Sequence, residues 1–187
     1  MACTDGIVKA ITSDCTTQKI GGLEVESYVM NRKDFIPTFD VTNESKITDV
    51  AMAATKTAFK LTGVNKNFNA GHDRVIAEGF ADTFTHYLSF KAFEVLAEDV
   101  ENIDNLKDIV VIVETKNETT SGEGMFLAYG VKAGLYVTTD TLRHNADNAS
   151  RNIEMASKEQ ETEEFSCYTV LDTDYATTKA ALEALLA

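Results

Sequence analysis

The chain has 187 residues, of which 44% are hydrophobic and 9% aromatic, and only one is proline. This composition predicts one globular domain with a real core and excludes a disordered chain. The net charge is −13, and residues 92–187 carry −12 of it, with seven Lys and Arg against nineteen Asp and Glu. Clamping nucleic acid or docking on a membrane needs clustered Lys and Arg, so the acidity argues against both.

The start of the chain lacks the features of a secretory signal. Residues 1–6 show no cationic and apolar pattern, and no run in the sequence approaches the roughly 18 apolar residues of a membrane span. We therefore expect a soluble protein that starts in the cytoplasm. Cys3, Cys15 and Cys167 form no Cys-x-x-Cys pair, which favours reduced thiols over a disulfide framework.

Residues 1–21 are rich in Thr, Ser, Asp and Gln and end at a Gly pair, which predicts a flexible N-terminal arm. Residues 22–187 then read as a single α+β domain dominated by antiparallel sheet. Short alternating or β-branched runs predict its strands: 23–29, 38–42, 47–52, 56–64, 83–93, 108–113, 125–129, 135–142, 152–157 and 165–171.

Three segments have a distinctive pattern. Thr83–Phe93 alternates an apolar face with a polar face, as in a strand with one core side and one wet side. Asp108–Val113 is a continuous β-branched run, which predicts the centre of the core. Asn65–Asp73 holds three Asn and a Gly, which favours a loop.

Two helices are expected. Leu96–Lys107 has apolar residues three to four apart, which predicts an amphipathic helix that flanks the sheet. Ala176–Ala187 consists of strong helix formers, with Asp172 or Thr173 as the expected N-cap and Asp174 favouring the positive helix start.

Few residues suggest catalysis. His86 falls in an apolar strand register and is expected to be a hydrogen-bonded core histidine. His72-Asp73 lacks the further ligands of a metal site, and Cys167 alternates into a strand as a small core residue. The acidic run at 159–164 reads as solvated, since nothing apolar surrounds it in the sequence. We expect no catalytic residue, cofactor or metal, and no enzyme.

The order of elements, together with Tyr129–Leu135 and Val170–Lys179, resembles the phage tail tube proteins, and both stretches are similar to small virion proteins of Bacteroidales phages and prophages. The resemblance runs from Gly22 to the carboxyl terminus. It implies a β-sandwich or barrel-like subunit with a flanking helix and a C-terminal helix. It also implies hexameric rings whose inner strands join into one β-barrel, stacked into a tube.

The family uses an N-terminal arm and a long inter-strand loop to bind the next ring, and the matching segments here are Thr4–Gly21 and Asn65–Arg74. The resemblance therefore implies an assembly interface made of these side chains: Thr16, Thr17, Asn65, Asn67, Phe68, Asn69, His72 and Arg74. It also implies other copies of the chain and other tail proteins as partners, double-stranded DNA as cargo that does not adhere, and a place in the virion tail after assembly in the bacterial cytoplasm.

A DNA conduit needs a wall without adhesive cations, and a domain of charge −13 is able to present repulsive carboxylates while its polar strand face wets the lumen. Other interpretations stay open. They are another virion role, such as a tail terminator, neck ring or capsid decoration protein, and a small module that binds a protein or carbohydrate through its loops. An enzyme built on His72-Asp73 or on a cysteine is the remaining alternative.

Overall fold

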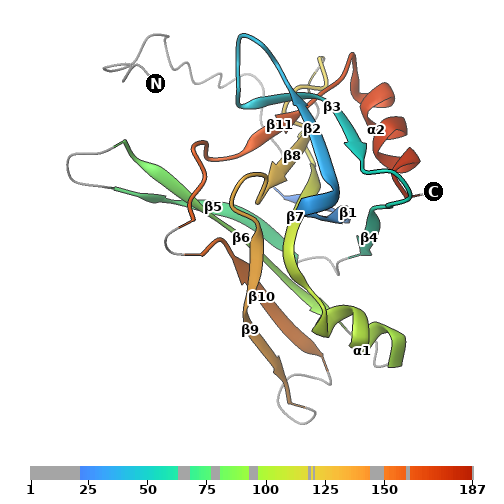
Figure 1. Cartoon of the computed structure of the whole chain (residues 1–187), viewed down its shortest axis with the longest axis vertical. Helices are drawn as coiled ribbons and strands as arrows, with labels where there is room; N and C mark the ends of the chain where they lie inside the picture. The colour runs from blue at the N-terminus through green and yellow to red at the C-terminus, as the bar shows by residue number, and fades with distance from the viewer. Residues whose placement is uncertain are drawn as a thin grey trace.

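The computed structural model describes residues 22–62, 68–76, 81–92, 97–117, 119, 121–143, 150–158 and 161–186. In these residues, eleven strands form one open, mixed sheet accompanied by two α-helices (Figure 1). The α+β class is confirmed. The expected sandwich or barrel is not evident within one chain, because the described part of the sheet does not close on itself.

The elements follow the chain in this order: β1 (Leu23–Asn31), the 3-10 turn η1 (Arg32–Asp34), β2 (Phe35–Phe39), β3 (Lys46–Met52), β4 (Phe59–Thr62), β5 (Asn69–Val75), β6 (Thr83–Ala92), α1 (Ala97–Asp104), β7 (Lys107–Thr115), β8 (Phe126–Tyr129), β9 (Leu135–Leu142), β10 (Arg151–Ala156), β11 (Tyr168–Val170) and α2 (Tyr175–Ala184).

The sheet has two parts that meet at β7. We call the first part the body; it contains β2, β3, β11, β8 and β7, with β1 and β4 branching from β7. We call the second part the wing; it is the four-stranded antiparallel run β9-β10-β6-β5. Figure 1 shows the wing extending away from the part of the body that carries α2. The only parallel pair of the described sheet, β3 with β11, lies in the body.

Strand β7 is the centre of the core, as its β-branched run predicts. Val110 and Ile112 point into one cluster of buried residues, against which Tyr175, Leu185 and Leu186 of the C-terminal region pack. Ile109, Val111 and Val113 point into a second cluster, which holds the apolar face of the wing and contacts Ile103 of α1. A strand buried on both faces needs apolar residues at every position rather than at alternate ones.

Most predicted strands lie within a few residues of the observed ones, and two differ more. The strand expected at 38–42 occupies Phe35–Phe39 instead. It ends there because Asp40 accepts hydrogen bonds at Oδ1 from the backbone amides of Thr42 and Asn43, which closes a turn. The strand expected at 165–171 is only Tyr168–Val170.

The C-terminal helix is confirmed, but its cap lies later than predicted. Asp174 is the N-cap, and its carboxylate accepts a hydrogen bond from the backbone amide of Thr177 at 2.8 Å. This bond lowers the pKa of Asp174. The helix begins at Tyr175, so the residue before it, Asp174, is the N-cap, and its extended φ and ψ are those of that position.

Candidate functional site

The residues predicted as an assembly interface lie partly on an edge strand. Asn69, His72 and Arg74 belong to β5, and Phe68 immediately precedes it and packs against the second core cluster. Asn65, Asn67, Thr16 and Thr17 lie outside the described residues.

The prediction of a loop over Asn65–Asp73 is wrong for its last five residues. Residues Asn69–Val75 pair with Thr83–Ser89 of β6 in continuous antiparallel register. The Asn and Gly content misled because cross-strand pairing overrides local preference. Gly71 has a packing role, since a Cβ there would lie 2.5 Å from the hydroxyl of Tyr87, its cross-strand partner.

Side chains at the Val75 and Thr83 ends of β5 and β6 hold this pair together. Arg74 forms an ion pair with Asp82 at 3.0 Å and lies over the ring of Phe84 at 5.8 Å. His72 makes an edge contact with the same ring. Beyond these residues, Val75 and Ile76 are exposed apolar side chains.

The wing has two edges whose backbone groups pair with no described strand. On one side, β5 pairs only with β6. On the other side, β9 pairs with β7 only at Leu135 and Tyr136, so that the outer edge of Val137–Leu142 is open. A strand edge of this kind is a template for pairing with another chain.

The far end of the wing is fastened to α1 by charge. The guanidinium of Arg151 on β10 donates to carboxylates of both Asp140 on β9 and Asp104 on α1. These two acids raise the pKa of Arg151. One arginine therefore ties two strands of the wing to α1, whose Ile103 packs against the second core cluster.

The near end of the wing is fastened to the body through His86. Its ring is fully buried; Nδ1 accepts from the backbone amide of Gly130 at 3.0 Å, and Nε2 lies 2.9 Å from the carbonyl oxygen of Phe165. Because Nδ1 is an acceptor, the neutral ring carries its proton on Nε2. Burial lowers the pKa of His86, while the negative charge of Glu163 opposes that shift. The prediction of a hydrogen-bonded core histidine is confirmed.

The acidic run at 159–164 is not uniformly solvated, which corrects the prediction for Glu163. That side chain is fully buried. Its Oε1 accepts from the backbone amides of Lys132 at 2.9 Å and Ala133 at 2.8 Å, and its Oε2 accepts from the hydroxyl of Tyr168 at 3.0 Å. Glu163 also bridges to Phe84 of β6 through backbone bonds. No local signal separates Glu163 from its exposed neighbours, because its partners are 30 or more residues away in the sequence except for Tyr168.

Cys167 is half-buried and packs against the second core cluster, as expected of a small core residue. Burial raises the pKa of its thiol, so that the thiol stays protonated and unreactive at neutral pH. Within the described residues, no group of three His, Cys, Asp or Glu side chains is placed to hold a metal ion. No described helix is long and apolar enough to cross a membrane.

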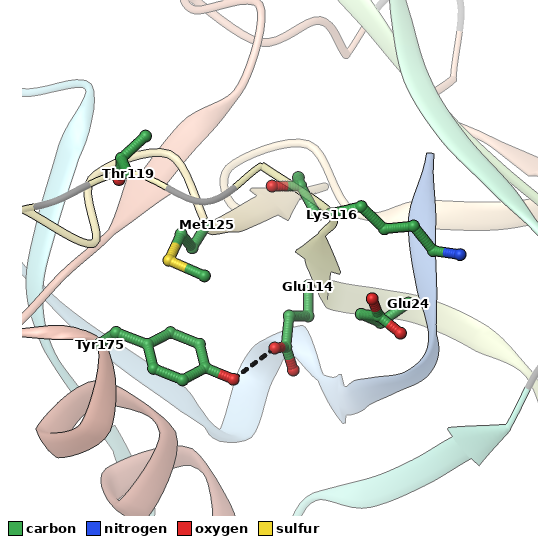
Figure 2. A pocket seen from close by; sticks show the side chains of 7 residues that line it. Glu24, Glu114, Lys116, Thr119, Met125 and Tyr175 are labelled. Carbon is green, nitrogen blue, oxygen red and sulfur yellow. Dashed lines mark hydrogen bonds between the residues drawn. The ribbon is translucent and has the colours of Figure 1, made fainter. Parts of the chain in front are cut away.

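A cavity of about 480 Å³ opens beside α2 and β7 (Figure 2). Its side chains are mixed in charge, with the seven lining residues being Glu24, Glu114, Thr115, Lys116, Thr119, Met125 and Tyr175. Figure 2 shows Tyr175 directed at Glu114, whereas the amine end of Lys116 points away from both.

The best-buried acid of this cavity is already neutralised. Glu114 accepts from the hydroxyl of Tyr175 at Oε1 and from the amine of Lys179 at Oε2, 3.2 Å away. Lys179 also donates to the Tyr175 hydroxyl at 3.0 Å. These contacts raise the pKa of both Tyr175 and Lys179. The cluster holds α2 on the end of β7, with both oxygens of Glu114 bound to side chains of the helix, so it acts as a structural clamp.

No protein-family model matches the chain, and neither the curated proteins nor the solved structures contain a significant match to it.

Proposed function

We propose that this chain is a structural virion protein that assembles with copies of itself into closed rings, and that the rings stack into a phage tail tube through which double-stranded DNA passes. Its partners would then be other copies of the chain and other tail proteins, and its location the virion tail. The observation that carries the proposal is the pair of open edges on the four-stranded wing.

The two edges are complementary in direction. The wing alternates strictly, because β9, β10, β6 and β5 are antiparallel neighbours, so β9 and β5 run in opposite directions. Copies of the chain in a ring are related by rotation about an axis that runs roughly along the strands, and such a rotation leaves the direction of each strand unchanged. The β5 edge of one copy would therefore meet the β9 edge of the next as an antiparallel pair, and a closed ring would leave no open edge on the wing.

The other edges of the sheet favour pairing less. Strand β2 carries Pro37, which lacks the backbone donor that a ladder needs. Strand β4 has only four residues. Strand β5 has seven residues and no proline, and the open part of β9 has six. The wing thus presents the longest unblocked edges of the described sheet.

The size of such a ring suits a DNA conduit. With a strand spacing of about 4.8 Å and a tilt of about 40°, four strands from each of six copies give a barrel roughly 48 Å across at the backbone. Three copies would give a barrel only about 24 Å across, most of which side chains fill. A hexamer leaves an aqueous channel wider than that of porins, which have 16 to 18 strands or so.

This arrangement gives the predicted interface residues a different task from the one the resemblance implies. Asn69, His72 and Arg74 would lie at the contact between neighbours within a ring, because they belong to the β5 edge. Thr16, Thr17, Asn65 and Asn67 remain a prediction for the contact between stacked rings.

Electron microscopy and sedimentation velocity of the full chain over a range of concentrations test the proposal. Rings or tubes with a central channel, and a mass that grows with concentration, are the expected result. A monomer at every concentration, with phage tail lysate added as a source of initiators, contradicts it. Closed rings that never stack would favour the tail-terminator alternative.

A pair of proline variants tests the edge itself. Backbone amides along an edge strand point alternately toward its partner and outward, so one of His72→Pro and Asp73→Pro removes an outward donor and the other removes a donor to β6. The variant that removes the outward donor should have the thermal unfolding of the wild type by circular dichroism, but it should no longer assemble. Normal rings from both folded variants would rule out β5 as the contact.

A further inference from the structure

The two faces of the wing differ sharply in chemistry. One face is apolar and lies against the body: Leu88 and Phe90 of β6 and Ile153 and Met155 of β10 are buried in the second core cluster. Paired residues of an antiparallel sheet point to the same side, so the register defines the opposite face as well.

We call that opposite face the polar face. Its members are exposed or half-buried, and most carry a hydroxyl or an amide. They are Tyr136, Thr139 and Thr141 of β9, Asn152, Glu154 and Ala156 of β10, Thr83, Thr85, Tyr87, Ser89 and Lys91 of β6, and Asn69, Gly71, Asp73 and Val75 of β5.

The polar face carries little of the charge of the protein. It holds two carboxylates, Asp73 and Glu154, and one cation, Lys91, which gives a net charge of −1 against −13 for the whole chain. Glu154 pairs with Ser89 and is therefore a diagonal neighbour of Lys91, within reach of its side chain. The lysine is thus partly compensated on its own face.

We infer that the polar face lines the lumen of the ring and makes it a nearly neutral, hydroxyl-rich wall for double-stranded DNA, with most of the acid of the protein lying elsewhere. The inference rests on the proposed function. In a ring closed through the β5 and β9 edges, the body packs on the apolar face and is too large to lie inside, so the polar face points inward.

This lumen differs from the repulsive wall of carboxylates considered from the sequence. Hydroxyl and amide groups bind water at the wall. DNA passes because Lys91 is the one cation of the polar face in each copy and lies next to Glu154, so the face has no cluster of cations that would bind phosphates. Repulsion contributes little, since one net negative charge in each copy is screened within about 8 Å at physiological ionic strength.

Thiol labelling locates the face. In a chain carrying Cys3→Ser, Cys15→Ser and Cys167→Ala, Ser89→Cys places a thiol on the polar face, and Glu101→Cys places one on the exposed surface of α1. Both should react with a bulky maleimide polymer in the unassembled chain. In tubes, Ser89→Cys should react at least tenfold more slowly, whereas Glu101→Cys should be unchanged.

Charge variants test the neutrality. Thr85→Lys with Ser89→Lys changes the charge by +2 in each copy, and Glu101→Lys gives the same change outside the polar face. Tubes of the first variant should retain labelled duplex DNA that nuclease cannot reach and that high salt releases. Tubes of the wild type and of Glu101→Lys should retain none.

The outcomes of these experiments distinguish failure of the proposed function from failure of the inference about the polar face. Absence of rings in the wild type overturns the proposed function. Tubes in which the Ser89→Cys thiol reacts as fast as in the unassembled chain overturn only the orientation, whether or not the Glu101→Cys thiol is protected. Wild-type tubes that retain duplex DNA overturn the neutral, non-adhesive lumen.

Discussion

The buried carboxylate of Glu163 and the hydroxyl of Tyr168 are joined by a hydrogen bond of 3.0 Å across only five residues of sequence. The other oxygen of Glu163 reaches the turn between β8 and β9, where it accepts from two consecutive backbone amides. Glu163 therefore joins the segment before β11, the strand β11 itself and the β8–β9 turn that leads into the wing.

We expect Glu163→Ala to lower the free energy of unfolding by about 3–5 kcal/mol, because it leaves two amides and a tyrosine hydroxyl buried without an acceptor. Glu163→Gln should cost less, since its amide oxygen still accepts from Lys132 and Ala133. Urea unfolding followed by circular dichroism measures both. Glu164→Gln is the matched control: its side chain is 36% exposed and forms a surface ion pair with Lys132, so the change should stay within about 0.5 kcal/mol. Equal effects at positions 163 and 164 would contradict the buried role.

His86 should make stability depend on pH. Its pKa is lowered in the folded chain, so the unfolded chain takes up a proton first as the pH falls below about 6.5. Stability from this group is present above that value and is lost below it, by at most about 1.4 kcal/mol for each pH unit, until the folded pKa is reached. A protonated Nδ1 would also face the Gly130 amide as a second donor.

Urea unfolding between pH 7 and pH 5 measures this dependence. His86→Phe should be less stable at pH 7, because Gly130 and Phe165 lose their partners, but its stability should fall less steeply with acid than that of the wild type. Parallel pH curves for the wild type and His86→Phe would show that another group carries the effect.

Strand positions were more predictable than their connections. The alternation of Thr83–Phe93 and the β-branched run at Asp108–Val113 identified β6 and β7, because burial of one face or of two leaves a direct mark on the sequence. β5 was missed because Asn69 and Gly71 are typical of loops, while their pairing with β6 depends on Tyr87 and Ser89 in another strand. Glu163 was missed for the same reason, since its burial is decided by the turn at Lys132 and Ala133.

The open edges of the wing could be predicted only in part. The Thr-rich alternation of β9 indicates a strand. Its pairing with β7 shifts in register at Asp108, and a local sequence pattern does not reveal such a shift. Asp108 has a positive φ of 55° and binds Arg32, so a specific contact supports the shift.

Gly130, at the start of the β8–β9 turn, should tolerate no side chain. Its φ is +76°, and a Cβ there would lie 2.9 Å from the carbonyl oxygen of Ile109 and 2.8 Å from the side chain of Leu135. We expect Gly130→Ala to cost about 2–4 kcal/mol, which combines left-handed strain with a clash against β7. Gly124→Ala is the control, because Gly124 has a φ of +81° and open space around its Cβ position. It should cost only the strain, about 1 kcal/mol. Thermal unfolding compares the two, and equal losses would mean that the backbone at Gly130 yields.

Arg151 should control how firmly α1 is held at the end of the wing. Its guanidinium joins Asp140 on β9 to Asp104 on α1 and is mostly buried at 16% side-chain exposure. Arg151→Met keeps most of the packing but leaves two carboxylates without their partner, so we expect a loss of about 1–2 kcal/mol, since Asp104 regains water. Hydrogen exchange should accelerate in α1 and at the end of β9 while β7 stays protected, because the core of the body does not depend on this contact. Lys158→Met is the matched control, as Lys158 forms an exposed ion pair with Glu161 and should leave exchange in α1 unchanged. If hydrogen exchange in Arg151→Met accelerates evenly over the body and the wing, the arginine supports the whole fold and not only the attachment of α1 to the wing.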